Sequence, residues 1–146
     1  MRPIKISGNS MNDFFKSGDI VFAQMGYYQC NEVQRSDIVL IKRTDTSEIL
    51  IKNVLMLPGD QFYLRGFAKG FHLLVNDSVL LTTKGKPYFF PLESEKVFRY
   101  YESNFFNKVP ESTYFVFGTK FDGSTDSSSF GPVYKYELIG RINKVK

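Results

Sequence analysis

The apolar positions of this chain gather in short runs rich in Val, Ile, Leu, Phe and Tyr, separated by Gly, Asp, Asn or Pro. Short runs divided by turn residues are typical of an all-β sandwich or barrel. No stretch keeps a helical period for long, so we expect any helix to be short. The runs predict strands at 20–23, 37–42, 48–57, 61–65, 71–75, 79–82, 97–101, 113–118 and 137–145.

The middle of the chain differs in texture from its two ends. It is aromatic and rich in turn residues, and Asn76-Asp77-Ser78 between two apolar runs predicts a hairpin turn. We therefore expect an all-β fold of twisted antiparallel sheets in a single domain, 1–146. Its core would comprise 1–65 and 110–146, with a small β insertion at about 66–109.

Composition fits an ordered globular domain. The 146 residues are enough for a real core, and 42% hydrophobic with 23% charged residues is an ordinary balance. The net charge of +4 comes from scattered Lys and Arg that form no arm or tail, so we expect no nucleic-acid partner. The single cysteine, Cys30, excludes an internal disulfide and leaves the redox compartment open.

No segment approaches the roughly 18 consecutive apolar residues that span a bilayer. The N-terminus also lacks the apolar region of a secretory signal. We expect the chain as given to be soluble or peripheral, with any membrane anchor outside this sequence. We expect no metal site and no cofactor, because one histidine and one cysteine leave only carboxylates without a ligand spacing. His72 lies in an apolar run and is expected to pack there, which argues against a histidine-based triad.

The first motif with candidate chemistry is a polar loop at 7–11, SGNSM, which precedes a Gly-Asp turn and an apolar strand. A nucleophilic serine needs an exposed hydroxyl and nearby N–H groups that can hold an oxyanion. Ser10 lies in such a loop, and Gly8 permits close approach of a substrate. Taken alone, the pattern is more often a plain turn.

The second motif is the strand at 48–57, which carries Lys52 on the same face as Leu50, Val54 and Met56. An ammonium among apolar neighbours loses hydration, which lowers its pKa from about 10.4 toward the range of a general base. A snorkelling lysine at a strand edge is the alternative. Ser/Lys dyads are an accepted form of activated nucleophile.

The third motif runs from 109 to 133, where a predicted strand leads into a long loop dense in hydroxyls and carboxylates. A hydroxyl there could orient the amine of Lys52. Alone, the segment is a solvated loop.

In order and spacing, the three segments resemble the conserved boxes of bacterial type I signal peptidases, the Ser/Lys family. The matching residues are SGNSM at 7–11 with Gly18-Asp19, IKNV at 51–54 with LPGD at 57–60, and the box from 109–118 through STDS at 124–127 to Phe130-Gly131. The resemblance covers both ends of the chain and is loose in the middle. It implies a serine endopeptidase that removes signal peptides from exported preproteins.

By this resemblance Ser10 is the nucleophile and Lys52 its general base. Ser124 would position Lys52, and Asp126 would hold the loop beside it. Substrate would carry small residues at the first and third positions before the cut, as in Ala-X-Ala.

The resemblance also implies the oxyanion hole and part of the substrate pocket. Ser10 would contribute its backbone N–H to the oxyanion hole. Gly8 stands where some members carry a second, side-chain donor. Met11 and the strand of Lys52 would wall shallow substrate pockets.

Four departures mark a divergent member of this family. The pattern's Pro-Thr is Asp13-Phe14, its basic residue after the lysine is Asn53, and its Asp-Asn-Arg is TKF at 119–121. The arginine that accompanies the aspartate of the last box is Ser128, so Asp126 loses its usual partner. We expect the 118–129 loop to be where the geometry differs most.

The resemblance implies partners in signal peptides and a membrane lipid surface, at the outer face of the cell membrane. Some of the 24 aromatic residues are candidates for dipping into the lipid interface, and ordinary burial is the alternative. These candidates are Phe14-Phe15, Tyr100-Tyr101 and Phe105-Phe106.

Three other functions stay open. A self-cleaving repressor-type domain shares the Ser/Lys dyad, but only nine residues precede Ser10 and the last box is not expected there. A conjugation-system maturation peptidase would differ only in substrate. A degenerate, non-catalytic peptide-binding module is favoured by the altered loop and disfavoured by the retained Ser10, Lys52 and Ser124.

Overall fold

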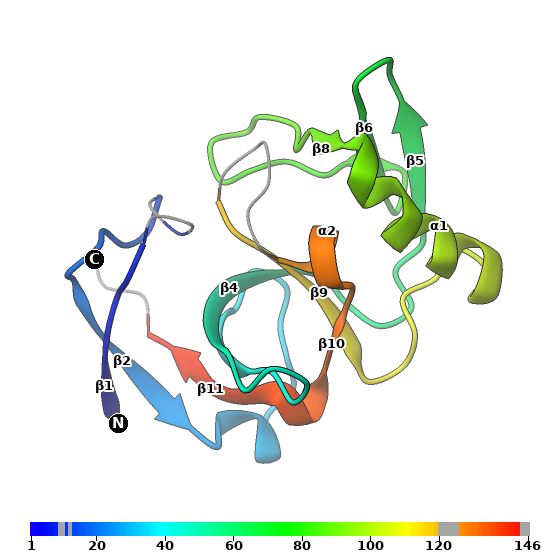
Figure 1. Ribbon diagram of the computed structural model, residues 1–146. Helices are drawn as coiled ribbons and strands as arrows, with labels where there is room; N and C mark the ends of the chain where they lie inside the picture. Colours follow the sequence, from blue (N-terminus) through cyan, green and yellow to red (C-terminus); the bar gives the residue numbers. More distant parts are fainter. Residues whose placement is uncertain (9–10, 12, 120–125, 144–146) are drawn as a thin grey trace.

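The computed structural model describes residues 1–8, 11, 13–119 and 126–143. Two antiparallel sheets dominate it, and Figure 1 shows them side by side with the helix α1 covering the smaller one. This architecture confirms the predicted all-β class.

The larger sheet has the order β1-β2-β11-β3-β4-β9-β10, so both ends of the chain contribute to it. A β-bulge in β4, between Val54 and Met56, shifts its register against β9. Bulges bend a strand, and Figure 1 shows β4 strongly curled. Its strands are β1 (Arg2–Lys5), β2 (Ile20–Met25), β3 (Ile38–Lys42), β4 (Ile49–Met56), β9 (Thr113–Phe117), β10 (Val133–Tyr134) and β11 (Leu138–Ile142).

The smaller sheet is built from consecutive strands in the middle of the chain. The predicted hairpin turn is confirmed, since β6 pairs with β7 and the backbone φ angles are 50° at Asn76 and 70° at Asp77. Two left-handed residues in a row are what a two-residue hairpin with type I′ geometry requires. The strands are β5 (Phe62–Gly66), β6 (Gly70–Val75), β7 (Ser78–Val79) and β8 (Phe90–Pro91).

The predicted strand at 97–101 is wrong, because these residues lie inside the helix α1 (Glu95–Asn104). Arg99 pairs with Glu95 and Glu102, at helical spacings of four and three residues. Phe98 is buried, so one face of the helix meets the core. The other helices are α2 (Ser127–Phe130) and the 3₁₀ turns η1 (Tyr27–Gln29), η2 (Leu92–Ser94) and η3 (Lys135–Glu137). None of the helices in the described part of the chain is long and apolar enough to cross a bilayer.

Three short strands were not predicted: β1, β8 and β10. β1 holds Pro3 and lies at the edge of the larger sheet, where a missing N–H is tolerated. Strands of two to four residues carry too few apolar positions for alternation to be recognised.

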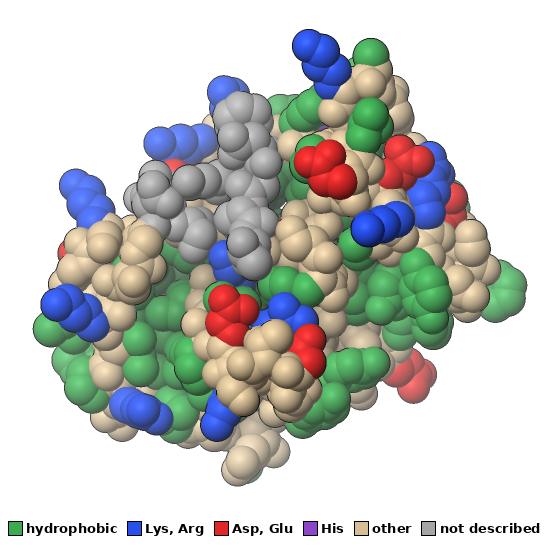
Figure 2. Space-filling view, viewed as in Figure 1, with side chains coloured by type: hydrophobic (Ala, Val, Ile, Leu, Met, Phe, Trp, Pro, Cys, Tyr) green, Lys and Arg blue, Asp and Glu red, His purple; other side chains and the backbone are tan. Residues whose placement is uncertain are grey.

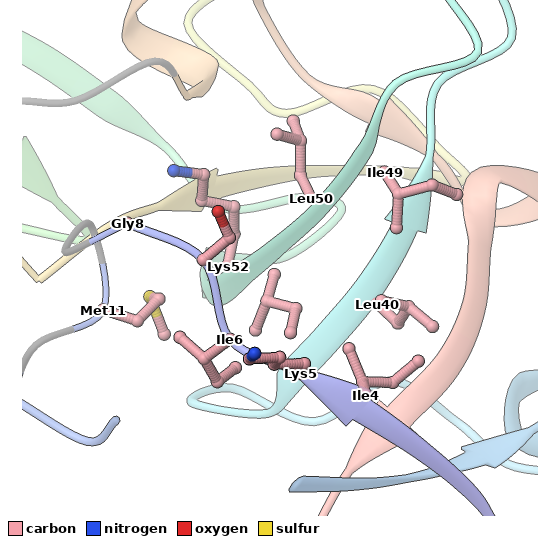
Figure 3. A pocket seen from close by; sticks show the side chains of 11 residues that line it. Ile4, Lys5, Ile6, Gly8, Met11, Leu40, Ile49, Leu50 and Lys52 are labelled. Atoms are coloured by element: carbon pink, nitrogen blue, oxygen red, sulfur yellow. The ribbon is translucent and has the colours of Figure 1, made fainter. Parts of the chain in front are cut away.

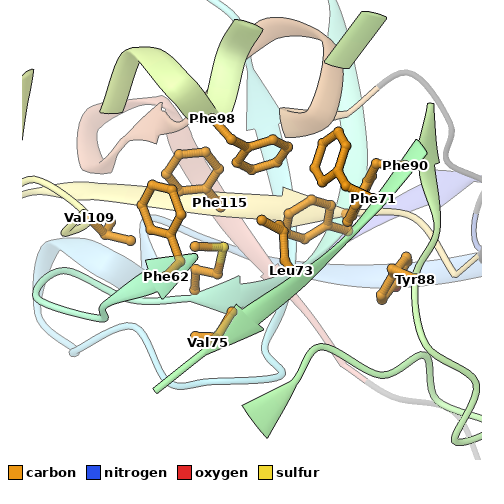
Figure 4. Packing of buried hydrophobic residues seen from close by; sticks show 11 residues of the cluster. Phe62, Phe71, Leu73, Val75, Tyr88, Phe90, Phe98, Val109 and Phe115 are labelled. Atoms are coloured by element: carbon orange, nitrogen blue, oxygen red, sulfur yellow. The ribbon is translucent and has the colours of Figure 1, made fainter. Parts of the chain in front are cut away.

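An aromatic cluster fills the space between the smaller sheet, α1 and β9 (Figure 4). The ring of Phe98 lies 5.6 Å from those of Phe90 and Phe115, 5.7 Å from Phe71 and 6.1 Å from Phe62. Stacked, tilted and edge-to-face ring contacts at these distances stabilise beyond simple burial. The cluster therefore joins the two sheets through one apolar layer.

A polar junction also connects the two sheets, at the turn between β4 and β5. The carboxylate of Asp60 accepts hydrogen bonds from both terminal nitrogens of Arg35, at 2.7 and 3.1 Å, and from the side chain of Asn76 at 3.0 Å. Burial opposes ionisation of Asp60, but these bonds and the Leu57 N–H outweigh it and hold its pKa below the usual range. The turn at 57–60 thus links the end of β4 to the β6–β7 hairpin, through the bond between Asp60 and Asn76.

The predicted division into a core and an insertion at 66–109 stays a proposal. The smaller sheet begins earlier in the chain, with Phe62 of β5, and α1 lies within the proposed insertion.

We predict that Phe98→Ala lowers the free energy of unfolding by about 3–5 kcal/mol, because it leaves a cavity among four aromatic rings. Phe106→Ala is the matched control: Phe106 is 85% exposed, so its loss should stay within about 0.5 kcal/mol. Urea denaturation of both variants measures the difference. Equal stability of the two would contradict a packed core at Phe98.

Candidate functional site

A pocket of about 270 Å³ lies between the N-terminal segment and the start of β4 (Figure 3). In sheet order β1 and β4 are separated by β2, β11 and β3, yet both line this pocket. The larger sheet therefore curls so that its edge strand β1 faces its inner strand β4 across the pocket. Leu40 of β3 also lines the pocket. The lining residues are Ile4, Lys5, Ile6, Ser7, Gly8, Met11, Leu40, Ile49, Leu50, Ile51 and Lys52.

Lys52 supplies the pocket's buried cation. It pairs with Val39 in the middle of the sheet and is only 3% exposed. Burial lowers the pKa of its ammonium, while the carboxylates of Asp126 and Glu48 act in the opposite direction. The predicted apolar setting is thus observed, and it favours the neutral amine that can accept a proton.

Gly8 and Met11 line the same pocket from the opposite side. The Met11 side chain is buried in a cluster with Ile6 and Phe15, which fixes this segment against the larger sheet. Gly8 has a φ of 82°, a backbone conformation that L side chains rarely adopt. This backbone conformation explains why position 8 is a glycine, although some family members carry a hydroxyl side chain there.

Two predicted site residues, Ser10 and Ser124, lie outside the described residues. Of the other predicted residues, the structure brings Gly8, Met11 and Lys52 to one pocket. Asp126 does not line the pocket, but its charge acts on Lys52.

Asp126 is fully buried and ties together the two ends of the loop that follows β9. One carboxylate oxygen accepts the Gly118 N–H at 3.1 Å, and the other accepts the Ser128 N–H at 2.9 Å. The Ser128 hydroxyl donates to that second oxygen at 2.7 Å. Ser128 occupies the position where the family pattern has an arginine. It donates hydrogen bonds to Asp126 from its neutral hydroxyl and its backbone N–H.

A second loop contact was missed by the sequence analysis. The N–H of Asp13 donates to the Thr119 hydroxyl at 3.3 Å, and the Asp13 carboxylate accepts a hydrogen bond from the Thr83 hydroxyl. Asp13 and Thr119 had been noted only as departures from the family pattern. That two departures from the family pattern, Asp13 and Thr119, occur in the same chain could have suggested that they contact each other. Nothing in the sequence suggested the contact with Thr83.

No group of three or more His, Cys, Asp or Glu side chains arranged to hold a metal ion is found among the described residues. His72 contacts the rings of Phe67 and Phe89 instead, as a half-buried member of an aromatic group. The polar side chains that line the pocket are Lys5, Ser7 and Lys52.

Comparison with known proteins points to one family. The family model described as "Signal peptidase, peptidase S26" matches residues 1–145. The chain is 30% identical to signal peptidase I V of Bacillus subtilis (strain 168), over 95% of this chain and 82% of that protein. It is 24% identical to signal peptidase I of Bacillus caldolyticus, over 94% of this chain and 75% of that protein.

The fold agrees with these matches. A crystal structure of a signal peptidase I from Enterococcus faecalis V583 superimposes with a TM-score of 0.51 at 24% identity, covering 77% of this chain and 98% of that one. At that identity the likeness concerns the fold alone, and the family model carries the assignment. The match over 1–145, with the 30% identity to a signal peptidase I, shows that this chain belongs to the signal peptidase family, peptidase S26.

Proposed function

We propose that this chain is a serine endopeptidase that removes signal peptides from exported preproteins, with Ser10 as nucleophile and Lys52 as general base. The observation that carries the proposal is the buried amine of Lys52. It has a lowered pKa and lies in a small pocket whose opposite wall includes Gly8 and Met11. Ser10 follows Gly8 by two residues and is joined to Met11 by a peptide bond.

In the proposed reaction the neutral Lys52 amine takes the proton of the Ser10 hydroxyl as its oxygen attacks the scissile carbonyl. The tetrahedral intermediate expels the amine of the mature protein, which receives that proton from Lys52. An ester between Ser10 and the signal peptide remains. Lys52 then takes a proton from water, the hydroxide attacks the ester, and the proton returns to the Ser10 oxygen as the signal peptide leaves with a free carboxylate.

The supporting roles follow the same scheme. The Ser10 N–H and the backbone around Gly8 would stabilise the oxyanion. Ser124 would orient the Lys52 amine, and Asp126 would keep the loop that carries Ser124 closed at both ends. Support for the Asp126 role comes from its bonds to Gly118 and Ser128, which flank that loop.

The pocket also supports the expected preference for small side chains before the cut, as in Ala-X-Ala. Its walls come from branched aliphatic residues such as Ile4, Ile6 and Leu40, and its volume of about 270 Å³ is small. A substrate with a bulky residue at that position would have to displace packed side chains, which is costly. The family match over 1–145 favours this function over a repressor-type domain.

We place the chain at a membrane lipid surface on the outer face of the cell. Exposed hydrophobic residues lie on β2 beside the pocket, with Ile20 paired to Lys5 and Phe22 paired to Pro3. Figure 2 shows such side chains gathered over β1 and β2 and, separately, near the end of α1. Of the candidates for exposure at the end of α1, Tyr100, Phe105 and Phe106 are exposed.

Two of the candidate lipid-facing aromatics are buried or packed instead, which was the alternative. Phe15 is 3% exposed and belongs to the core, and Tyr101 packs edge-on against the buried ring of Phe115. Phe14 is partly buried against the same cluster as Phe15. The aromatic ring most available to lipid in the described chain is therefore Phe106, on α1's side of the molecule.

Wild-type protein should cleave an Ala-X-Ala precursor peptide in detergent, and Ser10→Ala and Lys52→Met should reduce the rate at least about 10³-fold. Because the neutral amine is the base, the wild-type rate should rise with pH through the Lys52 pKa and level off below lysine's ordinary value. The control is Lys42→Met, an exposed lysine on β3, which should retain the wild-type profile. Activity surviving in either dyad variant would refute the mechanism, and an inert wild type would favour a binding module.

Ser128→Ala should lower the free energy of unfolding by about 2 kcal/mol, because it removes a buried hydrogen bond to a carboxylate. It should also slow cleavage, since the loop flanking Ser124 loses one of its ties. The adjacent exposed Ser129 provides the control, as Ser129→Ala should change neither quantity appreciably. If Ser129→Ala lost as much stability and cleavage rate as Ser128→Ala, the role assigned to Asp126 would be wrong.

Replacing Ile20 and Phe22 together with serine should weaken binding to anionic liposomes about tenfold, given about 1.5–3 kcal/mol for one fully buried apolar side chain and only partial insertion here. Co-sedimentation measures the change, with Phe106→Ser as comparison. Stronger loss in Phe106→Ser would move the lipid contact to the end of α1.

A further inference from the structure

The segment that follows Met11 is held from within by a tight turn. The N–H groups of Phe14 and Phe15 both donate to the Met11 carbonyl, at 2.9 and 2.8 Å. Met11 and Phe15 are buried at its two ends, and Asp13 between them is half-buried. Contacts that fix Asp13 therefore also fix the position of this turn.

Asp13 is held by residues from two distant parts of the chain. Its N–H donates to the Thr119 hydroxyl, 106 residues away, and its carboxylate accepts a hydrogen bond from Thr83, 70 residues away. The Lys84 ammonium lies 3.7 Å from the other carboxylate oxygen. Lys84 is 77% exposed, so this ion pair contributes little. The hydrogen bonds with Thr83, at the surface, and with Thr119, which is buried, are the directional contacts of Asp13.

Thr83 belongs to the connection between β7 and β8, which is itself ordered by backbone hydrogen bonds. The Thr82 N–H donates to the Lys86 carbonyl at 2.7 Å, and the Gly85 N–H donates to the Thr82 carbonyl at 2.9 Å. In Figure 1 this connection reaches from the smaller sheet toward the N-terminal segment. A turn closed in this way can hold a partner at a fixed distance.

The same connection also reaches the end of β9. Tyr88 is 1% exposed and stacks on Phe90, and its hydroxyl donates to the Gly118 carbonyl at 2.6 Å. Gly118 in turn donates its N–H to Asp126. One connection of the smaller sheet therefore contacts both the turn after Met11 and the strand end that leads to Thr119.

We propose that the connection at 80–88 is a strut that positions the turn after Met11 and the strand end at Gly118 and Thr119, with Thr83 and Tyr88 as positioning residues. This inference rests on the proposed function for its kinetic consequence, but not for its structural one. A displacement of about 1 Å in a catalytic group can cost 10²-fold in rate. Loss of a few positioning hydrogen bonds should therefore change kcat more than it changes the free energy of unfolding.

The test compares Thr83→Val with Thr83→Ser in the full chain. Thr83→Val loses the hydroxyl at nearly constant shape and should lower kcat three- to tenfold, with KM within twofold and the melting temperature unchanged. Thr83→Ser keeps the donor and should restore kcat. The same substitution in an exposed turn of the larger sheet, Thr46→Val, should leave kcat as in the wild type.

A double-mutant cycle isolates the contact. If Thr83 acts through Asp13, the variant with both Asp13→Ala and Thr83→Val should be no slower than Asp13→Ala alone. Additive losses, or a kcat in Thr83→Val equal to that of the wild type, would overturn the proposal.

Hydrogen exchange separates this inference from the proposed function. The Phe14 and Phe15 amides should exchange at least threefold faster in Thr83→Val than in the wild type and Thr46→Val. Unchanged exchange would overturn the strut even if the protein cleaves peptides. Faster exchange would support it even if the wild type proved inactive.

Discussion

The dehydration of one amine is the constraint on which the rest of this structure depends. Lys52 occupies a central position of β4, where lost hydration lowers its pKa and the carboxylates of Asp126 and Glu48 limit that effect. A buried lysine is costly, so the surrounding packing must be stable enough to hold it. The curl of the larger sheet meets this need by closing the N-terminal segment over β4.

Hydrogen bonds hold the segments at both ends of the undescribed loops near this lysine. Asp126 receives two N–H groups and one hydroxyl, and Asp13 is reached by the hydroxyls of Thr83 and Thr119. Hydrogen bonds are directional, so each of these contacts constrains both a distance and an angle. Three of the departures of this chain from its family's pattern, Asp13, Thr119 and Ser128, thus take part in polar contacts with neighbouring segments.

The smaller sheet is linked to the larger sheet by three kinds of contact. The aromatic cluster around Phe98 joins the sheets by packing, the Asp60 network with Arg35 and Asn76 fixes their junction, and Tyr88 bonds to the end of β9. Packing supplies most of the stability, while the polar contacts set relative position. The smaller sheet is therefore part of the frame that holds the pocket.

The sequence by itself determined the fold class, most strands, the hairpin at Asn76 and the apolar setting of Lys52, because these follow from local alternation and turn chemistry. It missed α1, since a ten-residue run containing Val97 and Tyr101 satisfies strand preference as well as helix preference. Only the tertiary structure decided that Gly8 and Met11 face Lys52, that Ser128 partners Asp126, and that Thr83 reaches Asp13. Most of these contacts join residues tens of positions apart, so they depend on the path of the backbone, which local periodicity does not encode.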